Sequence, residues 1–208
     1  MIPAFEAIKA ISNHRNNAVV VGTMTPNRYW EQVSTRPELD LPIFGAMGKA
    51  SSVALGLALA RPDVKILVLD GDGAVLMNLG TLVTIAGQQP ANLVHFVFED
   101  GVYFSTGGQP VPGVGTFDLL SMAKSAGFRE SLRFDDLEEF VDELPDVLTK
   151  RGPVFVCLTV THSEDAPAVY IKSTREAMNR VSVTLRDVYK PMLPSDQTHL
   201  DESDTQSC

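Results

Sequence analysis

The chain of 208 residues has little of several features that define broad classes of protein. It contains two cysteines, Cys157 in an apolar segment and Cys208 at the last position. They are too few for a four-thiolate iron–sulfur cluster and are not expected to form a disulfide. Basic residues number 17 against 26 acidic ones, for a net charge of −9. The basic face on which nucleic-acid binding depends is therefore not expected. The two cysteines in turn disfavour oxidoreductases that carry their own iron–sulfur cluster.

Long hydrophobic runs are also missing. No stretch of about 18 apolar residues occurs, and no charged-then-apolar leader is present, so neither a membrane span nor a secretory signal is expected. We therefore expect a cytoplasmic protein. The composition, 44% hydrophobic and 21% charged, is typical of one well-packed domain, which we assign to residues 1–190. Residues 191–208 are polar and acidic and are predicted to form a disordered tail.

Two apolar segments separated by a helical one dominate the middle of the chain. Residues 66–69 predict a buried strand that ends in the sequence DGDG (70–73), where two glycines permit a sharp turn and close approach to a ligand. A helix is predicted over residues 76–88, ended by a proline. Residues 93–98 then predict a second strand, which ends in the sequence EDG (99–101). The unit is strand–helix–strand.

The two acidic turns of this unit should lie side by side. Parallel strands joined by a crossover helix end at the same edge of a sheet, so the carboxylates of Asp72 and Asp100 should face one cleft. Hard oxygen ligands beside the backbone amides of a helix start suit Mg²⁺ with a phosphate group attached. The pattern predicts such a site, although a GDG sequence by itself is also typical of an ordinary glycine turn.

The motifs together are more specific than GDG alone. Asp100 lies 28 positions after Asp72 (100 − 72), and residues 99–109 read EDGVYFSTGGQ. With this spacing the chain resembles the diphosphate-binding domain of thiamine diphosphate (TPP) enzymes over about residues 17–160. In the sequence of its second turn it most resembles the β subunits of sulfopyruvate decarboxylase and the matching half of phosphonopyruvate decarboxylase. Those proteins have Asn where Asp100 stands, and the family often has Ser where Ala74 stands.

The resemblance implies a fold and a ligand set. The fold is a doubly wound α/β domain of about six mainly parallel strands with helices on both faces. Mg²⁺ would be bound by the side chains of Asp72 and Asp100 and the carbonyl of Val102. Met47 would support the cofactor between its two rings, with a gap-filling methionine as the alternative. The implied cofactor-binding residues are Gly22, Thr23, Ala46, Met47, Gly71, Asp72, Gly73, Ala74, Asp100, Val102 and Tyr103; for the first two, a plain strand-to-loop turn stays open.

The resemblance also implies an activity. It is that of a TPP- and Mg²⁺-dependent subunit that decarboxylates a 2-oxo acid, with an acyloin-forming carboligase or a non-catalytic binding module as alternatives. In such enzymes a glutamate that activates the cofactor belongs to a pyrimidine-binding domain of comparable size, for which 208 residues leave no room. The catalytic residues are therefore expected in a partner chain, a pyrimidine-binding α-type subunit, and the assembly is expected to be a hetero-oligomer.

The remaining elements are predicted from periodicity and from helix-ending residues. Three polar residues stay without an assigned role: His95 is interpreted as a packed strand residue, His162 as part of a surface loop, and Lys49 as a surface or anion-facing side chain. The predicted elements are helices over 3–13, 27–36 (capped by Asn27), the residues before Pro62, 117–126 (ended by Gly127), 135–148 and 173–189, and strands over 18–21 and 154–160.

Overall fold

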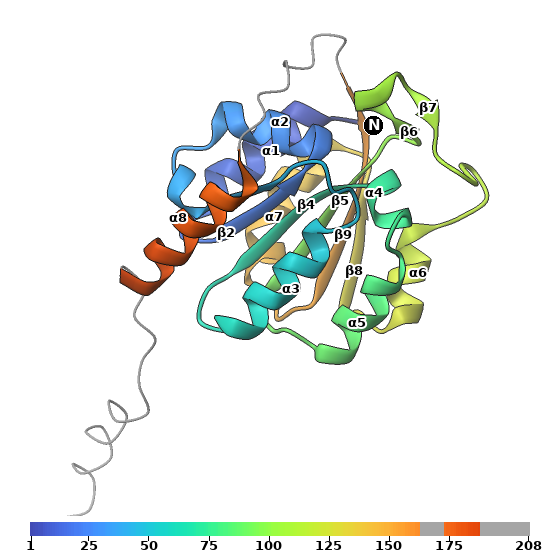
Figure 1. Cartoon of the computed structure of the whole chain (residues 1–208). Helices are drawn as coiled ribbons and strands as arrows, with labels where there is room; N and C mark the ends of the chain where they lie inside the picture. Colours follow the sequence, from blue (N-terminus) through green and yellow to red (C-terminus); the bar gives the residue numbers. More distant parts are fainter. Residues whose placement is uncertain (163–172, 188–208) are drawn as a thin grey trace, which may run out of the picture.

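The computed structural model describes residues 1–162 and 173–187. Its centre is a seven-stranded sheet in which every neighbouring pair is parallel (Figure 1). The order is β1-β9-β5-β4-β2-β3, and β8 also lies beside β9. The strands are β1 Ile2–Pro3, β2 Val19–Thr23, β3 Asp40–Ile43, β4 Ile66–Gly71, β5 Leu93–Glu99, β8 Glu130–Phe134 and β9 Val154–Thr161.

Helices cover both faces of this sheet (Figure 1). One face packs against α1 Ala4–His14, α2 Met24–Val33 and α7 Leu137–Thr149. The other packs against α3 Ala50–Ala60, α5 Gly80–Gln88, α6 Leu119–Ala126 and α8 Thr174–Asp187. Alternate strand residues enter the two cores: Val19 and Val21 lie in one and Val20 in the other. The predicted doubly wound fold is confirmed, with seven strands in the main sheet rather than about six. Within the described residues, no helix is both long and apolar enough to cross a membrane.

Several element boundaries differ from the predictions. Helix α2 begins at Met24 with Thr23 as its N-cap residue, so the predicted cap at Asn27 is wrong. Asn27 lies inside the helix, where its amide donates to the Glu31 carboxylate at 3.3 Å. The predicted helix over 76–88 is divided into α4 Asp72–Leu76 and α5. The strands β1, β3 and β8 were not predicted. The tail assigned to 191–208 lies outside the described residues.

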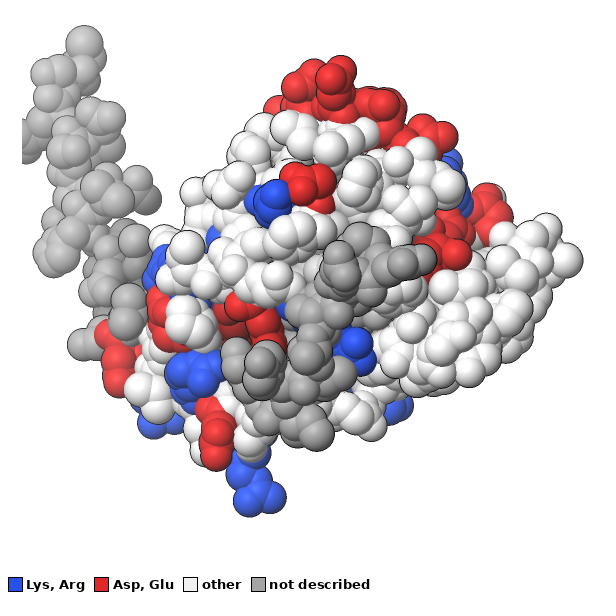
Figure 2. Space-filling view, turned by 90° about the horizontal axis from the view of Figure 1, so that it is seen from above, with Lys and Arg blue, Asp and Glu red and all other residues white. Residues whose placement is uncertain are grey.

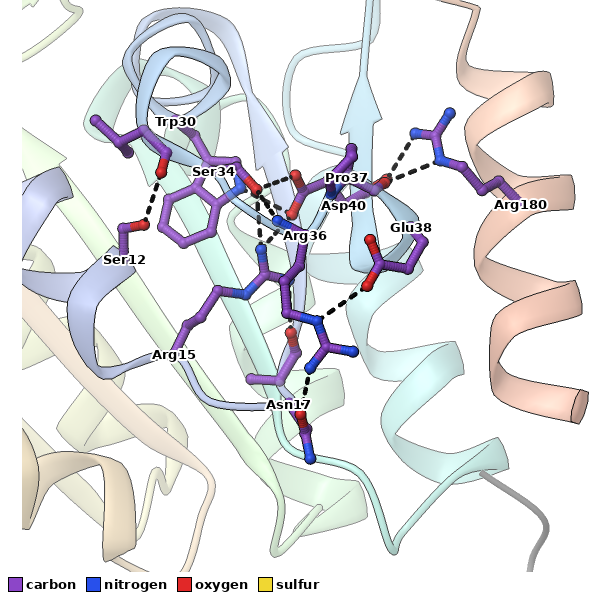
Figure 3. A network of polar contacts seen from close by, with 12 residues as sticks. Ser12, Arg15, Asn17, Trp30, Ser34, Arg36, Pro37, Glu38, Asp40 and Arg180 are labelled. Atoms are coloured by element: carbon purple, nitrogen blue, oxygen red, sulfur yellow. Dashed lines mark hydrogen bonds and ion pairs between the residues drawn. The ribbon is translucent and has the colours of Figure 1, made fainter. Parts of the chain in front are cut away.

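A polar network at the N-terminal edge of the sheet joins α1, α2 and β3 (Figure 3). Asp40, the first residue of β3, accepts hydrogen bonds from the Arg15 guanidinium (2.7 Å), the Trp30 indole (2.9 Å) and the Ser34 hydroxyl (2.5 Å). Arg15 is 4% exposed and also lies over the Trp30 ring, 5.1 Å from its centroid. The network joins these elements at the end of the sheet opposite the loops that follow β4 and β5.

Candidate functional site

The two acidic turns meet at the C-terminal edge of the sheet. Strands β4 and β5 are parallel neighbours, with Gly71 opposite Phe98, so the loops that follow them lie side by side. The Gly101 amide donates to Oδ2 of Asp72 at 2.7 Å, which joins the two turns directly. The Gly73 amide donates to the other carboxylate oxygen at 2.6 Å. The predicted proximity of the two turns is therefore confirmed.

Asp72 is a buried carboxylate with an unfavourable charge environment. The residue is only 2% exposed. Burial, together with the charges of the Asp100 and Glu99 carboxylates, raises the pKa of Asp72 to about 6, although the hydrogen bonds from the Gly101 and Gly73 amides act in the opposite direction. Glu99 has its own cation, Arg133. At neutral pH a cation bound at Asp72 would relieve this uncompensated charge.

Asp100 is held by a histidine from a third loop. His162, directly after β9, places Nε2 at 2.9 Å from Oδ2 of Asp100, and the Val102 amide donates to Oδ1 at 3.1 Å. The imidazole contacts the rings of Tyr29 and Phe104, with centroid distances of 5.7 and 4.5 Å. The interpretation of His162 as a plain surface-loop residue is therefore wrong. The neighbouring residues Ser163 and Glu164 lie outside the described part of the chain.

The STGGQ motif forms a short hairpin beside the GDG turn. Strand β6 (Val102–Tyr103) pairs antiparallel with β7 (Gln109–Pro110), and the connecting turn contains the 3₁₀ helix Phe104–Thr106. Tyr103 packs so closely on Gly73 that a Cβ there would lie 2.4 Å from the tyrosine ring. The last glycine of GDG is therefore required by packing inside the chain.

The loop that carries Met47 is anchored to the end of α4. Gly48 has a φ of +73°, and a Cβ on it would lie 2.9 Å from Cβ of Asn78. The Asn78 amide donates to the Gly48 carbonyl at 2.8 Å. This contact accompanies the break between α4 and α5 and holds Met47 at the site. Lys49 is exposed.

A pocket lies between the two acidic turns, the start of α2 and the hairpin. Eight of the eleven predicted cofactor-binding residues line it; Gly22, Thr23 and Ala46 do not. Thr23 is fully buried and donates its hydroxyl to the Ile43 carbonyl, and Ala46 packs against the core. The lining residues are Met24, Thr25, Pro26, Met47, Gly71, Asp72, Gly73, Ala74, Phe98, Asp100, Val102, Tyr103, Phe104, Ser105, Thr106 and His162.

The donor set at this pocket is incomplete in protein side chains. Throughout residues 1–162 and 173–187, no group of three or more His, Cys, Asp and Glu side chains is arranged to hold a metal. A metal ion at Asp72 would therefore need backbone carbonyl, phosphate or water oxygens as well, which is the coordination that Mg²⁺ accepts. The buried, electronegative carboxylate fits such an ion.

The surface beside the pocket is uncharged. Residues 104–117 contain no Asp, Glu, Lys or Arg. They form the white projection on the right of Figure 2, where Figure 1 shows the chain leaving the hairpin β6–β7. Val114 within it is 49% exposed. A protruding uncharged segment at the rim of a pocket is typical of a surface that another molecule covers.

Curated relatives of this chain include decarboxylases. Phosphonopyruvate decarboxylase of Streptomyces viridochromogenes is 38% identical over 146 residues, which cover 70% of this chain and 36% of that protein. The sulfopyruvate decarboxylase subunit beta of Methanothermobacter thermautotrophicus is 35% identical over 171 residues, which cover 81% of this chain and 88% of that subunit. This chain thus spans about a third of the first relative and most of the second.

Solved structures and a family model agree with these relatives. Benzoylformate decarboxylase from Polynucleobacter necessarius has the same fold, with a TM-score of 0.62 at 20% identity over 76% of this chain and 32% of that one. The family model described as "Thiamine pyrophosphate enzyme, C-terminal TPP binding domain" matches residues 20–158. The matched span begins within β2, ends within β9 and contains both acidic turns. The chain therefore belongs to the thiamine pyrophosphate enzymes, through their C-terminal TPP-binding domain.

Proposed function

We propose that this chain is the TPP- and Mg²⁺-binding subunit of a 2-oxo acid decarboxylase assembled from two kinds of chain. The proposal rests on the environment of the Asp72 carboxylate. This carboxylate is buried at the GDG turn, is joined to the second turn through Gly101, and forms no ion pair with a cationic side chain of the residues that the structure describes. In a domain of this family, a divalent cation with diphosphate oxygens is the ligand that matches such a carboxylate.

The chain's own residues would act by binding and orientation. Asp72 and Asp100 would hold the metal through carboxylate oxygens, with the carbonyl of Val102 as a further ligand. Met47, at the pocket wall, would support the cofactor by steric contact. The hairpin would exclude water from the diphosphate side. When bound, TPP would supply the electron sink that accepts the electron pair of the broken C–C bond as a 2-oxo acid releases CO₂.

Two observations support a partner chain. The sulfopyruvate decarboxylase relative is named a subunit beta and is matched over most of its length, whereas phosphonopyruvate decarboxylase is matched over 36% of its length. The unmatched part of the longer relative is what a second chain would supply here. The uncharged projection formed by residues 104–117 supports the same assembly, since charged residues are depleted at the centres of protein interfaces. A pyrimidine-binding α-type subunit is the proposed partner, and the cytoplasm is the proposed location.

A carboligase is the second candidate. Acetolactate synthase of Bacillus subtilis is 28% identical over 127 residues, which cover 57% of this chain and 22% of that protein. The same cofactor chemistry ends in free aldehyde in a decarboxylase and in an acyloin when a second carbonyl compound is the acceptor. Product analysis separates the two candidates.

The test has two stages. Calorimetry of the purified chain with TPP should show binding that requires Mg²⁺ and is lost with EDTA. The chain is then combined with a sulfopyruvate decarboxylase α-type subunit and given a panel of 2-oxo acids. We expect CO₂ release from the mixture and none from either chain alone. No TPP binding in the presence of Mg²⁺ would refute the proposal, and turnover by the single chain would refute the two-chain assembly.

A further inference from the structure

We propose that Tyr29 and His162 form a hydrogen-bonded relay that positions the Asp100 carboxylate, so that His162 is a positioning residue for the metal side of the site. This inference rests on the proposed function, because its measurable consequence is Mg²⁺-dependent binding of TPP. It concerns three residues that are far apart in the sequence. They come from α2, from the loop after β5 and from the end of β9.

The topology of the sheet brings the three residues together. Strands β5 and β9 are parallel neighbours, with Glu99 opposite Thr159, so the residues that follow them reach the same edge. Asp100 comes one residue after β5 ends, and His162 one residue after β9 ends. Their side chains are 10% and 5% exposed, and Nε2 of His162 lies 2.9 Å from Oδ2 of Asp100. The contact is therefore largely shielded from solvent.

The direction of each hydrogen bond follows from chemistry. An ionised carboxylate only accepts hydrogen bonds, so Nε2 of His162 is the donor to Asp100. In the neutral imidazole Nδ1 is then an acceptor. The hydroxyl of Tyr29 lies 3.3 Å from Nδ1 and supplies the donor.

The imidazole is also held sterically. The ring of Tyr29 is stacked on it at 5.7 Å with an interplanar angle of 15°, and Phe104 lies on it at 4.5 Å and 30°. Tyr29 itself packs on Phe5 at 5.5 Å. Contacts with two aromatic rings and hydrogen bonds at both nitrogens restrict the orientation of the imidazole.

The consequence is a fixed orientation for the Asp100 carboxylate. One oxygen accepts from His162 and the other from the Val102 amide, so the remaining lone pairs have set directions. Mg²⁺ demands near-ideal octahedral geometry, and groups that orient a metal ligand typically change metal affinity by about 10–100-fold when removed. We therefore expect His162 to act on metal affinity through Asp100 and not by contact with the ion.

The experiment measures Mg²⁺ affinity at saturating TPP by calorimetry, which needs no partner chain and no turnover. His162→Asn removes the donor at the Nε2 position and should weaken Mg²⁺ binding by about 10–100-fold. His162→Gln places an amide nitrogen near the Nε2 position and should restore affinity to within about fivefold of the parent. Tyr29→Phe removes only a hydroxyl and should weaken binding by about two- to fivefold, roughly the loss of one hydrogen bond.

A double-mutant cycle separates positioning from general structure. In the Asp100→Ala background His162→Asn should cost at most about threefold, because the ligand that His162 orients is no longer present. His14→Asn, at the far end of α1, is the matched control and should bind like the parent, and circular dichroism checks the fold of each variant. Equal losses in both backgrounds, or parent-like affinity of His162→Asn, would overturn the inference while the proposed function stands. If the parent itself does not bind TPP with Mg²⁺, the proposed function fails first.

Discussion

Two aspartates at opposite edges of one sheet have opposite charge environments. Asp40, at the N-terminal edge, has the guanidinium of Arg15, an indole and a hydroxyl as donors within the chain. Asp72, at the C-terminal edge, has two backbone amides and is repelled by the carboxylates of Asp100 and Glu99, with a pKa of about 6. A carboxylate whose charge is compensated inside the fold serves structure, whereas one left uncompensated at a pocket is suited to an external cation.

The largest expected effect follows from replacing the uncompensated carboxylate. Asp72→Ala should abolish Mg²⁺-dependent TPP binding, a loss of at least about 1,000-fold, because the central side-chain ligand of the proposed site is removed. Calorimetry with TPP and Mg²⁺ measures it. The circular dichroism spectrum should stay that of the parent. Parent-like affinity for TPP in this variant would show that the metal assignment is wrong.

The compensated carboxylate should give the reverse result. Asp40→Ala leaves the Arg15 guanidinium, 4% exposed, without its carboxylate partner, and breaking a buried ion pair typically costs about 3–5 kcal/mol. For a chain of this length that corresponds to a fall in Tm of roughly 10 °C. Urea unfolding and thermal scans measure the loss. TPP affinity of the folded fraction should be unchanged, and a selective loss of binding without destabilisation would contradict the division of roles.

The contrast also predicts how pH acts on the metal-free protein. The pKa of Asp72 is about 6 in the folded protein, whereas the ordinary value for an aspartate is 3.8. The folded state therefore binds the proton more tightly than the unfolded chain. The free energy of unfolding therefore falls as pH rises from about 4 to about 6, and this destabilisation is fully present above pH 6. A shift of this size corresponds to an upper limit of about 3 kcal/mol.

Asp72→Asn isolates this contribution from other titrating groups. Urea unfolding in EDTA at pH 4.5 and pH 7.5 gives a stability difference for the parent and for the variant. We expect the parent to lose about 2 kcal/mol more than the variant between the two pH values. Mg²⁺ with TPP at pH 7.5 should restore the parent and leave the variant unchanged. Identical pH dependence of stability in both proteins would show that the charge of Asp72 is already compensated inside the fold.

The parts of this site that could be predicted from the sequence depend on local signals. The apolar run before DGDG and the proline after residue 88 mark the strands and the helix between them, and parallel pairing then puts Asp72 next to the second turn. Gly127 ends α6 with a φ of +103°, as glycine at that place predicts. Each of these features is decided by residues within a few positions of one another.

The parts that could not be predicted depend on contacts between distant segments. The strand β8 has the polar sequence ESLRF and is identified only by its pairing with β9. His162 had a positional signal, because it directly follows a strand that neighbours β5, but its orientation toward Asp100 depends on contacts with Tyr29 and Phe104, which are distant in the sequence. The packing of Tyr103 on Gly73 likewise could not be predicted from the GDG motif, which is interpreted as a ligand-binding loop.

Steric support should have a smaller effect than charge. Met47 lines the pocket from a loop held by the contact between Gly48 and Asn78, and truncation leaves that anchor in place. Met47→Ala should lower turnover of the reconstituted enzyme by roughly tenfold, because a misplaced cofactor reacts from a poorer geometry. Mg²⁺ affinity measured by calorimetry should stay within about twofold of the parent. Unchanged turnover in the folded variant would remove Met47 from the site.

The smallest effect is expected at the second acidic turn. The Asp100 carboxylate attracts Mg²⁺ and repels the diphosphate, and at ~4 Å with an effective dielectric of 20 each of these opposing energies is on the order of 4 kcal/mol, so they largely cancel. Asp100→Asn removes both and keeps an oxygen for the metal. We expect TPP affinity at saturating Mg²⁺ to be equal to that of the parent or up to about threefold tighter, measured by the same calorimetry as for Asp72→Ala. A loss of more than about tenfold would mean that cation binding needs the carboxylates of both Asp72 and Asp100. The contrast with Asp40 would then apply to both aspartates at this edge.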